Sequence, residues 1–335
     1  MENISTYQLR AGSIEMVVTN LGARVMKLLV PNAAGCLADV VLGYNTVEEY
    51  LDNKGERFLG AVCGRFADRI AKGKFTIDGQ SYSLPVNNNG QTLHGGIKGL
   101  DMVVWSVVKH SESSILFRYV SPDGEEGFPG VLTIDMLYRL TEANEFAIEY
   151  SATTTKKTPV NLTHHSFFNL RGEGNGSING HILHVNASKY IPIDRFSIPT
   201  GEIASVKGTP FNFLSPISIG ARLKCDNGQL RMGAGYDHCF VIDGQGMRLA
   251  ATVVEPESGR KMAVYTDQPG IQFYGGNFFD GKTTSKSGVR SYEHRGALAL
   301  ETQNFPDAPN QSSFPNSILS PGETYKHRCT YKFFM

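Results

Sequence analysis

Two adjacent histidines, His164 and His165, lie within a segment of Asn, Thr, Ser and Phe side chains at residues 161–170. This mixture can hydrogen-bond a polyol and stack on its ring. An imidazole with an unperturbed pKa of about 6.5 gives or takes a proton near neutral pH. If the segment is extended, its neighbouring side chains point to opposite faces, so only one histidine enters a given pocket and the other is structural. An isolated pair is more often structural than catalytic.

A carboxylate, Glu301, follows the apolar run Ala-Leu-Ala-Leu at residues 297–300. The run predicts a buried strand that ends at this glutamate. Desolvation at the end of an apolar strand raises the pKa of a carboxyl group toward the range of a general base. The alternative is a structural glutamate in a salt bridge.

Several other polar side chains stand beside glycines or turns. His94 lies in a glycine-rich loop, where the backbone can approach a ligand closely, but turn stabilisation is equally plausible. Asp237 suits either an Asx turn or a ligand contact. Gln272 lies among aromatics and glycines, which suits a sugar face or the edge of a β-core. Arg65 and Arg69 are more often solvated or ion-paired than ligand-binding.

The elements that must position these groups are strands. Residues 131–140 alternate apolar and polar side chains, and residues 146–150 resume the pattern. Asp78-Gly79 between two alternating runs is a strong hairpin signal. Short helices are predicted at 46–51, capped by Thr46, and at 215–223. With no sustained helical period, phosphate loop or HExxH motif, we expect an all-β fold, a large antiparallel β-sandwich with few short helices.

Composition narrows the class of partner. Of 335 residues, 41% are hydrophobic and 19% charged, and 32 Lys plus Arg balance 32 Asp plus Glu. No net field attracts nucleic acid or an anionic membrane, so a neutral partner fits better. Five scattered cysteines without a CxxC pair argue against a disulfide framework and indicate a reducing compartment. Without a leader-like N-terminus or an apolar span, the sequence predicts a cytoplasmic protein.

Six motifs in one order make the chain resemble the aldose 1-epimerases, the galactose mutarotase family. They cover nearly the whole chain and read GRFADRIAKGKF at 64–75, TLHGG at 92–96, NLTHHSFFNL at 161–170, GYDH at 235–238, PGIQFYGGNF at 269–278 and ETQNFP at 301–306. The resemblance implies a galactose mutarotase-like supersandwich, a single domain over residues 1–335. It also implies an isomerase that interconverts the α and β anomers of free aldohexoses such as galactose and glucose, with no metal and no organic cofactor.

The resemblance also implies roles for individual residues. Glu301 is the general base and His165 the general acid. The residues implied to bind the sugar are Asp68, Arg69, His94, Asp237 and Gln272. His164 stands where the family more often has Asn, and Asp68 stands where Asn commonly precedes the arginine. An ionised aspartate only accepts hydrogen bonds, whereas an asparagine also donates them, so this difference bears on hydroxyl recognition.

Three rival functions remain open. A hexose-6-phosphate 1-epimerase needs a cluster of Arg or Lys for the phosphate, and outside Arg65 and Arg69 no such cluster is evident near the motifs. A non-catalytic carbohydrate-binding module would keep the pocket but not both proton-transfer groups. Glycoside hydrolysis generally uses two carboxylates, whereas the best pair here is one carboxylate and one imidazole. We expect a monosaccharide substrate, no nucleic acid or membrane partner, and a monomer or weak homodimer.

Overall fold

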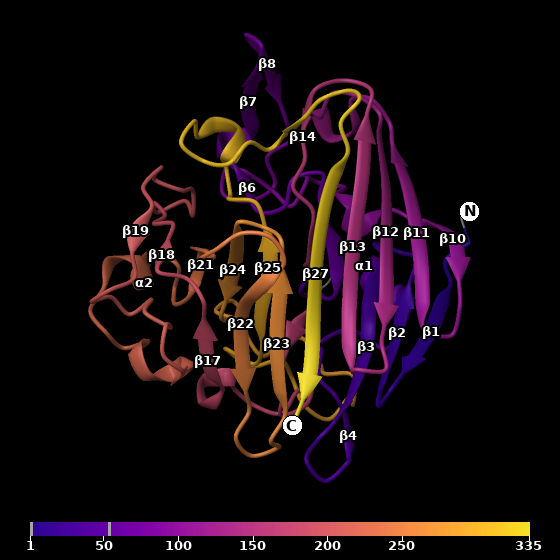
Figure 1. Ribbon diagram of the computed structural model, residues 1–335, viewed down its shortest axis with the longest axis vertical. Helices are drawn as coiled ribbons and strands as arrows, with labels where there is room; N and C mark the ends of the chain where they lie inside the picture. Colours follow the sequence, from indigo (N-terminus) through magenta and orange to yellow (C-terminus); the bar gives the residue numbers. More distant parts are fainter. Residues whose placement is uncertain (1–2, 53–54) are drawn as a thin grey trace.

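A computed structural model describes residues 3–52 and 55–335 and consists mainly of antiparallel strands (Figure 1). The largest sheet has nine strands, whose members in spatial order are β10 (Ser106–His110), β11 (Ser114–Ser121), β12 (Leu132–Leu140), β13 (Glu145–Thr154), β27 (Tyr325–Phe334), β23 (Lys261–Thr266), β22 (Arg248–Val254), β17 (Ile182–Val185) and β20 (Ile217–Ser218). In Figure 1 this sheet lies in front of two smaller sheets. The layers therefore form the predicted sandwich.

The two smaller sheets lie behind different parts of the large one (Figure 1). The six-stranded sheet has the order β16 (Phe167–Phe168), β25 (Leu298–Gln303), β24 (Gly270–Tyr274), β21 (Asp237–Val241), β18 (Lys189–Tyr190) and β19 (Ala204–Ser205). The four-stranded sheet has the order β1 (Thr6–Ala11), β2 (Ile14–Thr19), β3 (Arg24–Pro31) and β4 (Leu37–Asp39).

Short ribbons and helices complete the fold. Four two-stranded pairs are β5 (Ala61–Cys63) with β15 (Thr163–His165), β6 (Arg69–Ile70) with β9 (Thr92–Leu93), β7 (Lys74–Ile77) with β8 (Gln80–Ser83), and β14 (Thr158–Pro159) with β26 (Ile318–Leu319). The α-helices of the described residues are α1 (Val47–Asp52) and α2 (Gly228–Met232). Over these same residues, the search for a helix with the length and hydropathy of a membrane span finds none.

One large hydrophobic cluster joins all three sheets. It contains Met16 of β2, Ile134 of β12, Phe273 of β24, Leu300 of β25 and Tyr331 of β27, each almost fully buried. The period of two predicted for residues 132–140 is confirmed, because every second side chain of β12 is buried. Burial of one face of each sheet against another is what holds the sandwich together.

Most of the predicted local structure is confirmed. Asp78 and Gly79 both adopt positive φ in the turn between β7 and β8. Thr46 caps α1, its Oγ1 accepting a hydrogen bond from the Glu49 amide at 3.4 Å. All five cysteines are free.

Two local predictions need correction. Within residues 215–223 the predicted short helix is limited to a 3-10 helix at Ile219–Arg222, and strand β20 precedes it. The strand expected to end at Glu301 continues through Gln303, because Thr302 and Gln303 pair in register with β24. Hydrophobicity could not predict this extension, since the last three side chains of β25 are polar and nevertheless buried.

Candidate active site

Seven predicted side chains line one cavity with a volume of about 210 Å³. They are Asp68, Arg69, His94, His165, Asp237, Gln272 and Glu301. The cavity is smaller than the roughly 300–1,000 Å³ of sites for drug-sized ligands, and its size suits a single small polar ring. Residues that are far apart in sequence therefore meet at one place.

The floor of the cavity is formed by adjacent strands of the six-stranded sheet. Gln272 on β24 and Glu301 on β25 are directly paired across the two strands. Cross-strand partners project from the same face of a sheet, so both side chains reach the cavity together. On the other side of β24, β21 begins with Asp237, which pairs with Tyr274. Three strands thus deliver three polar groups to one surface.

Strand β15 brings the predicted acid to the predicted base. His165 Nε2 lies 3.3 Å from Glu301 Oε1, and both side chains are almost fully buried. His164 points to the opposite face, where its Nδ1 lies 3.1 Å from Tyr138 Oη and its Nε2 lies 2.6 Å from Ser166 Oγ. The prediction that only one of the two histidines enters the pocket is confirmed.

His94 is held in one tautomer by the backbone of Asp68. The Asp68 amide donates to His94 Nδ1 at 3.0 Å, and the His94 amide donates to the Asp68 carbonyl at 3.0 Å. A neutral imidazole that accepts at Nδ1 carries its hydrogen at Nε2. His94, His165 and Glu301 each place a possible metal-ligand atom within 4.8 Å of the others. The tautomer of His94, however, suits donation to a hydroxyl group better than metal coordination.

Arg69 is oriented by two neighbours. Its Nε donates to Asn88 Oδ1 at 3.3 Å, and its Nη1 lies 3.4 Å from Asp68 Oδ1. Asp68 Oδ1 also accepts the Arg69 amide at 2.7 Å. The Asp68 carboxylate is therefore engaged with Arg69. By contrast, Arg65 is buried away from the cavity. Its guanidinium donates to Ser121 Oγ and to the carbonyl oxygens of Ser121, Pro122, Pro129 and Gly130.

Several buried polar atoms of the cavity lack partners. Gln272 Nε2 donates to Asp237 Oδ1 at 2.7 Å, which leaves Gln272 Oε1 without a hydrogen bond among the described residues. Glu301 Oε2 has none there either, and His165 Nδ1 has no partner in another described residue. Unpaired buried polar atoms are costly, so their concentration indicates a site that a polar ligand completes.

Burial also shifts the protonation of the site. Desolvation lowers the pKa of His165 to about 4. Desolvation, reinforced by the charges of Asp68 and Asp237, raises the pKa of Glu301 well above its ordinary value. It likewise raises the pKa of Asp237 to about 6 and lowers the pKa of His94 well below its ordinary value. Strongly shifted pKa values in a cavity are characteristic of functional sites.

One wall of the cavity comes from a turn that no sequence motif predicts. Phe58 stacks on His165 at a centroid distance of 6.0 Å and meets His94 edge-on at 4.6 Å. Glu56 lines the same cavity. The other lining residues not predicted are Asn88, Leu93, Phe167, Tyr274 and Phe278. No periodicity marks Glu56 or Phe58, because only tertiary contacts bring their turn to the histidines.

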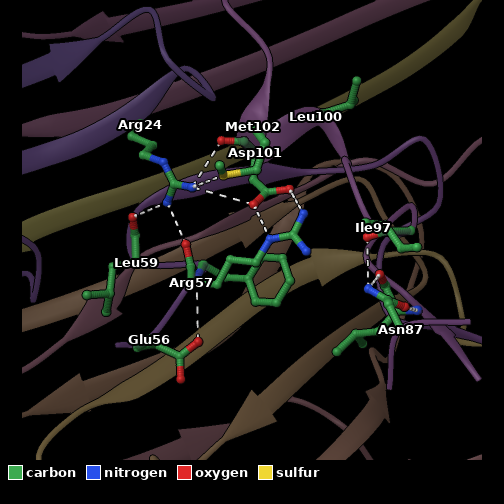
Figure 2. Close-up of polar contacts among 12 residues, drawn as sticks. Arg24, Glu56, Arg57, Leu59, Asn87, Ile97, Leu100, Asp101 and Met102 are labelled. Atoms are coloured by element: carbon green, nitrogen blue, oxygen red, sulfur yellow. Dashed lines mark hydrogen bonds and ion pairs between the residues drawn. The ribbon is translucent and has the colours of Figure 1, made fainter. Parts of the chain in front are cut away.

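A buried ion cluster fixes that turn, as Figure 2 shows. Arg57 binds Asp101 through two hydrogen bonds, from Nε at 2.7 Å and from Nη2 at 2.9 Å. Arg24, which is fully buried, donates to the carbonyls of Arg57, Leu59 and Asp101 at 2.9 to 3.0 Å. A bidentate pair resists displacement. The cluster therefore holds Phe58 over the two imidazoles.

Comparison with known proteins agrees with this geometry. The family described as aldose 1-epimerase matches residues 5–332. The chain belongs to the aldose 1-epimerase family. It is 43% identical to the galactose mutarotase of Bos taurus over 331 residues, covering 98% of this chain and 94% of that protein. It is 38% identical to the aldose 1-epimerase of Escherichia coli (strain K12) over 324 residues, covering 95% and 92%.

A solved structure shares the architecture of this aldose 1-epimerase family member. The aldose epimerase homologue from C. elegans superposes with a TM-score of 0.91 at 29% identity and covers 99% of both chains. The predicted fold class and family are therefore confirmed. The chain is an enzyme, an isomerase that acts on carbohydrates.

Proposed function

We propose that this enzyme interconverts the α and β anomers of free aldohexoses, with Glu301 and His165 as its proton-transfer groups. The observation that carries the proposal is the 3.3 Å separation of Glu301 Oε1 and His165 Nε2 at the floor of a small polar cavity. A pyranose opens when one proton leaves the anomeric hydroxyl and another reaches the ring oxygen. A carboxylate and an imidazole on one cavity wall supply both transfers.

The steps follow from these two groups. Glu301 takes the proton of the C1 hydroxyl while His165 protonates the ring oxygen, and the C1 to ring oxygen bond breaks. The resulting aldehyde rotates about C1–C2 and exposes its other face. The C5 hydroxyl then attacks C1, His165 takes back its proton, and Glu301 returns its proton to the new anomeric oxygen. Atoms and charge balance over the cycle, and no redox step occurs.

The pair works with one shared proton. Burial raises the pKa of Glu301 and lowers that of His165, which favours the arrangement with the proton on Glu301 and a neutral His165. The same arrangement, with the proton on Glu301, is reached after ring opening. Moving that proton to His165 gives the ionised pair that starts ring opening. Because both arrangements hold one proton, the enzyme can enter the cycle from the cyclic or the open sugar.

The remaining predicted side chains hold the sugar in this proposal. His94 donates from Nε2, and Arg69 donates from its guanidinium. Asp237 and the free Oε1 of Gln272 accept hydrogen bonds from hydroxyl groups. Asp68 acts mainly by orienting Arg69 and by fixing the tautomer of His94 through its backbone.

The charge of the cavity favours a neutral sugar over a hexose 6-phosphate. Among the described lining residues, four carboxyl groups face a single guanidinium, that of Arg69. The carboxyl groups belong to Glu56, Asp68, Asp237 and Glu301. An adjoining groove of about 640 Å³ adds Glu49, Asp52 and Asp280 beside Lys282. A phosphate dianion would meet like charge on entry. The burial of Arg65 supports the same conclusion.

Polarimetry tests the proposal. Purified protein should accelerate the change in optical rotation of freshly dissolved α-galactose and α-glucose. Glucose 6-phosphate should respond much more weakly. Acceleration with the phosphate alone would favour the phosphate epimerase, and binding without acceleration would favour a carbohydrate-binding module. We also propose that the chain forms one domain. We propose a cytoplasmic location, which cell fractionation tests, and a monomer or weak homodimer, which analytical ultracentrifugation tests.

A further inference from the structure

The last strand of the large sheet, β27, reaches across the sandwich to the strands that carry the proton-transfer groups. Tyr325 Oη accepts the Leu162 amide at 3.2 Å, and Tyr331 Oη donates to the Leu300 carbonyl at 2.8 Å. Leu162 directly precedes β15, and Leu300 directly precedes Glu301. Side chains on the inner face of β27 thus bind the backbone of both catalytic segments.

His327 is the one of these β27 side chains whose hydrogen bonds join the two segments to each other. Its Nδ1 lies 3.1 Å from the Leu162 carbonyl, and its Nε2 lies 2.8 Å from Thr302 Oγ1. The carbonyl only accepts, so Nδ1 carries the hydrogen and Thr302 donates to Nε2. Thr163 Oγ1 adds a direct bond to the Thr302 carbonyl at 2.9 Å. The bridge therefore runs from the β15 segment through one imidazole to β25.

Burying a histidine at this position costs free energy unless both ring nitrogens are hydrogen-bonded. Its side chain is fully buried and stacks on Tyr150 at 5.1 Å. An apolar side chain would fill such a site without needing any partner, whereas a buried imidazole requires both of its hydrogen bonds. Both bonds end close in sequence to a side chain that supplies the chemistry. Thr302 follows Glu301, and Leu162 lies three residues before His165.

We propose that His327 is a positioning residue that sets the separation of Glu301 and His165 by tying their strands together. It touches neither the cavity nor the sugar, so it governs the alignment of proton transfer and not sugar affinity. A misplacement of about 1 Å at reacting atoms can lower a rate by about 10²-fold. This inference rests on the proposed roles of Glu301 and His165.

Steady-state mutarotation of galactose by the full-length protein tests the bridge. Thr302→Val removes the donor to His327 but keeps the shape of the side chain, and His327→Leu removes the bridge entirely. Each variant should lower kcat by about 10-fold to 100-fold while KM stays near the wild-type value. Thr302→Ser retains the hydroxyl group and should recover most of kcat.

His181→Leu is the matched control. His181 is almost as buried, its Nε2 accepts the Leu170 amide at 3.1 Å, and neither residue is among those that line the cavity. This variant should lose thermal stability but keep kcat, measured at a temperature where circular dichroism shows folded protein. Wild-type kcat in folded Thr302→Val overturns the proposal, as does an equal loss in Thr302→Ser. If wild-type protein itself fails to catalyse mutarotation, the proposed function falls instead.

Discussion

The two faces of β15 place neighbouring histidines in opposite environments. His164 lies among Tyr138, Phe146 and Tyr331, and both of its ring nitrogens have partners. His165 lies in the cavity, with Glu301 as the partner of Nε2 and with no other described residue bonded to Nδ1. Burial lowers the pKa of both imidazoles, to about 3 for His164 and about 4 for His165. Burial and pKa alone do not separate a structural histidine from a catalytic one.

The difference between the faces is hydrogen-bond completion. On the core face, both ring nitrogens of His164 have hydrogen-bond partners, which stabilises the native packing. The cavity instead concentrates unpaired atoms on His165, Gln272 and Glu301. Such atoms reduce stability until a ligand supplies their partners. The two faces therefore predict opposite responses to mutation, with activity lost on one and stability lost on the other.

The largest effect is expected for Glu301→Gln. The amide keeps the shape of the side chain but cannot act as a base, so kcat should fall by about 10² to 10⁴. Unfolding experiments should show no loss of stability, since a buried ionisable group is removed. Polarimetry measures kcat, and normal turnover would refute the assignment.

The paired variants His165→Ala and His164→Asn test the two faces directly. His165→Ala should lower kcat by about 10² to 10⁴ through loss of the acid. His164→Asn removes a ring from the aromatic core and should lower the free energy of unfolding by about 1 to 3 kcal/mol. Its kcat per folded molecule should stay near wild type. A large kcat loss in His164→Asn would contradict the division of roles.

A smaller effect is expected for Gln272→Leu. This change removes the free acceptor Oε1 and the donor to Asp237, so KM for galactose should rise about tenfold (~1.4 kcal/mol), with a lesser effect on kcat. Initial rates over a range of galactose concentrations separate the two parameters. An unchanged KM would remove Gln272 from the sugar contacts.

The smallest effect is expected for the pH dependence and for Asp68→Asn. Activity should be highest between an acid and an alkaline limit, because the Glu301 and His165 pair holds one proton there. It should fall toward pH 4 as a second proton binds, and at high pH as the shared proton leaves. The charge of Asp68 helps to raise the pKa of Glu301. In Asp68→Asn the alkaline limb should therefore move to lower pH by about one unit or less. A shift to higher pH would contradict this sign.

Much of the fold could be predicted from local patterns. The alternation of residues 132–140 became β12, and Asp78-Gly79 became the turn of a hairpin. The seven candidate site residues were predicted through motifs of the family they resemble, and all line one cavity. Glu56 and Phe58 carried no such signal, and neither did the extension of β25 through Gln303.

By itself the sequence determined the strand periodicity, the turn positions and the chemical types available for proton transfer, because each depends on a residue and its near neighbours. Only the tertiary structure decided how near Glu301 lies to His165 and how far burial moves their pKa values. Those properties arise from strands that are distant in sequence. They depend on three tertiary features: the register of β24 with β25, the position of His165 on β15 beside Glu301, and the hydrogen bond from β27 between His327 and Thr302.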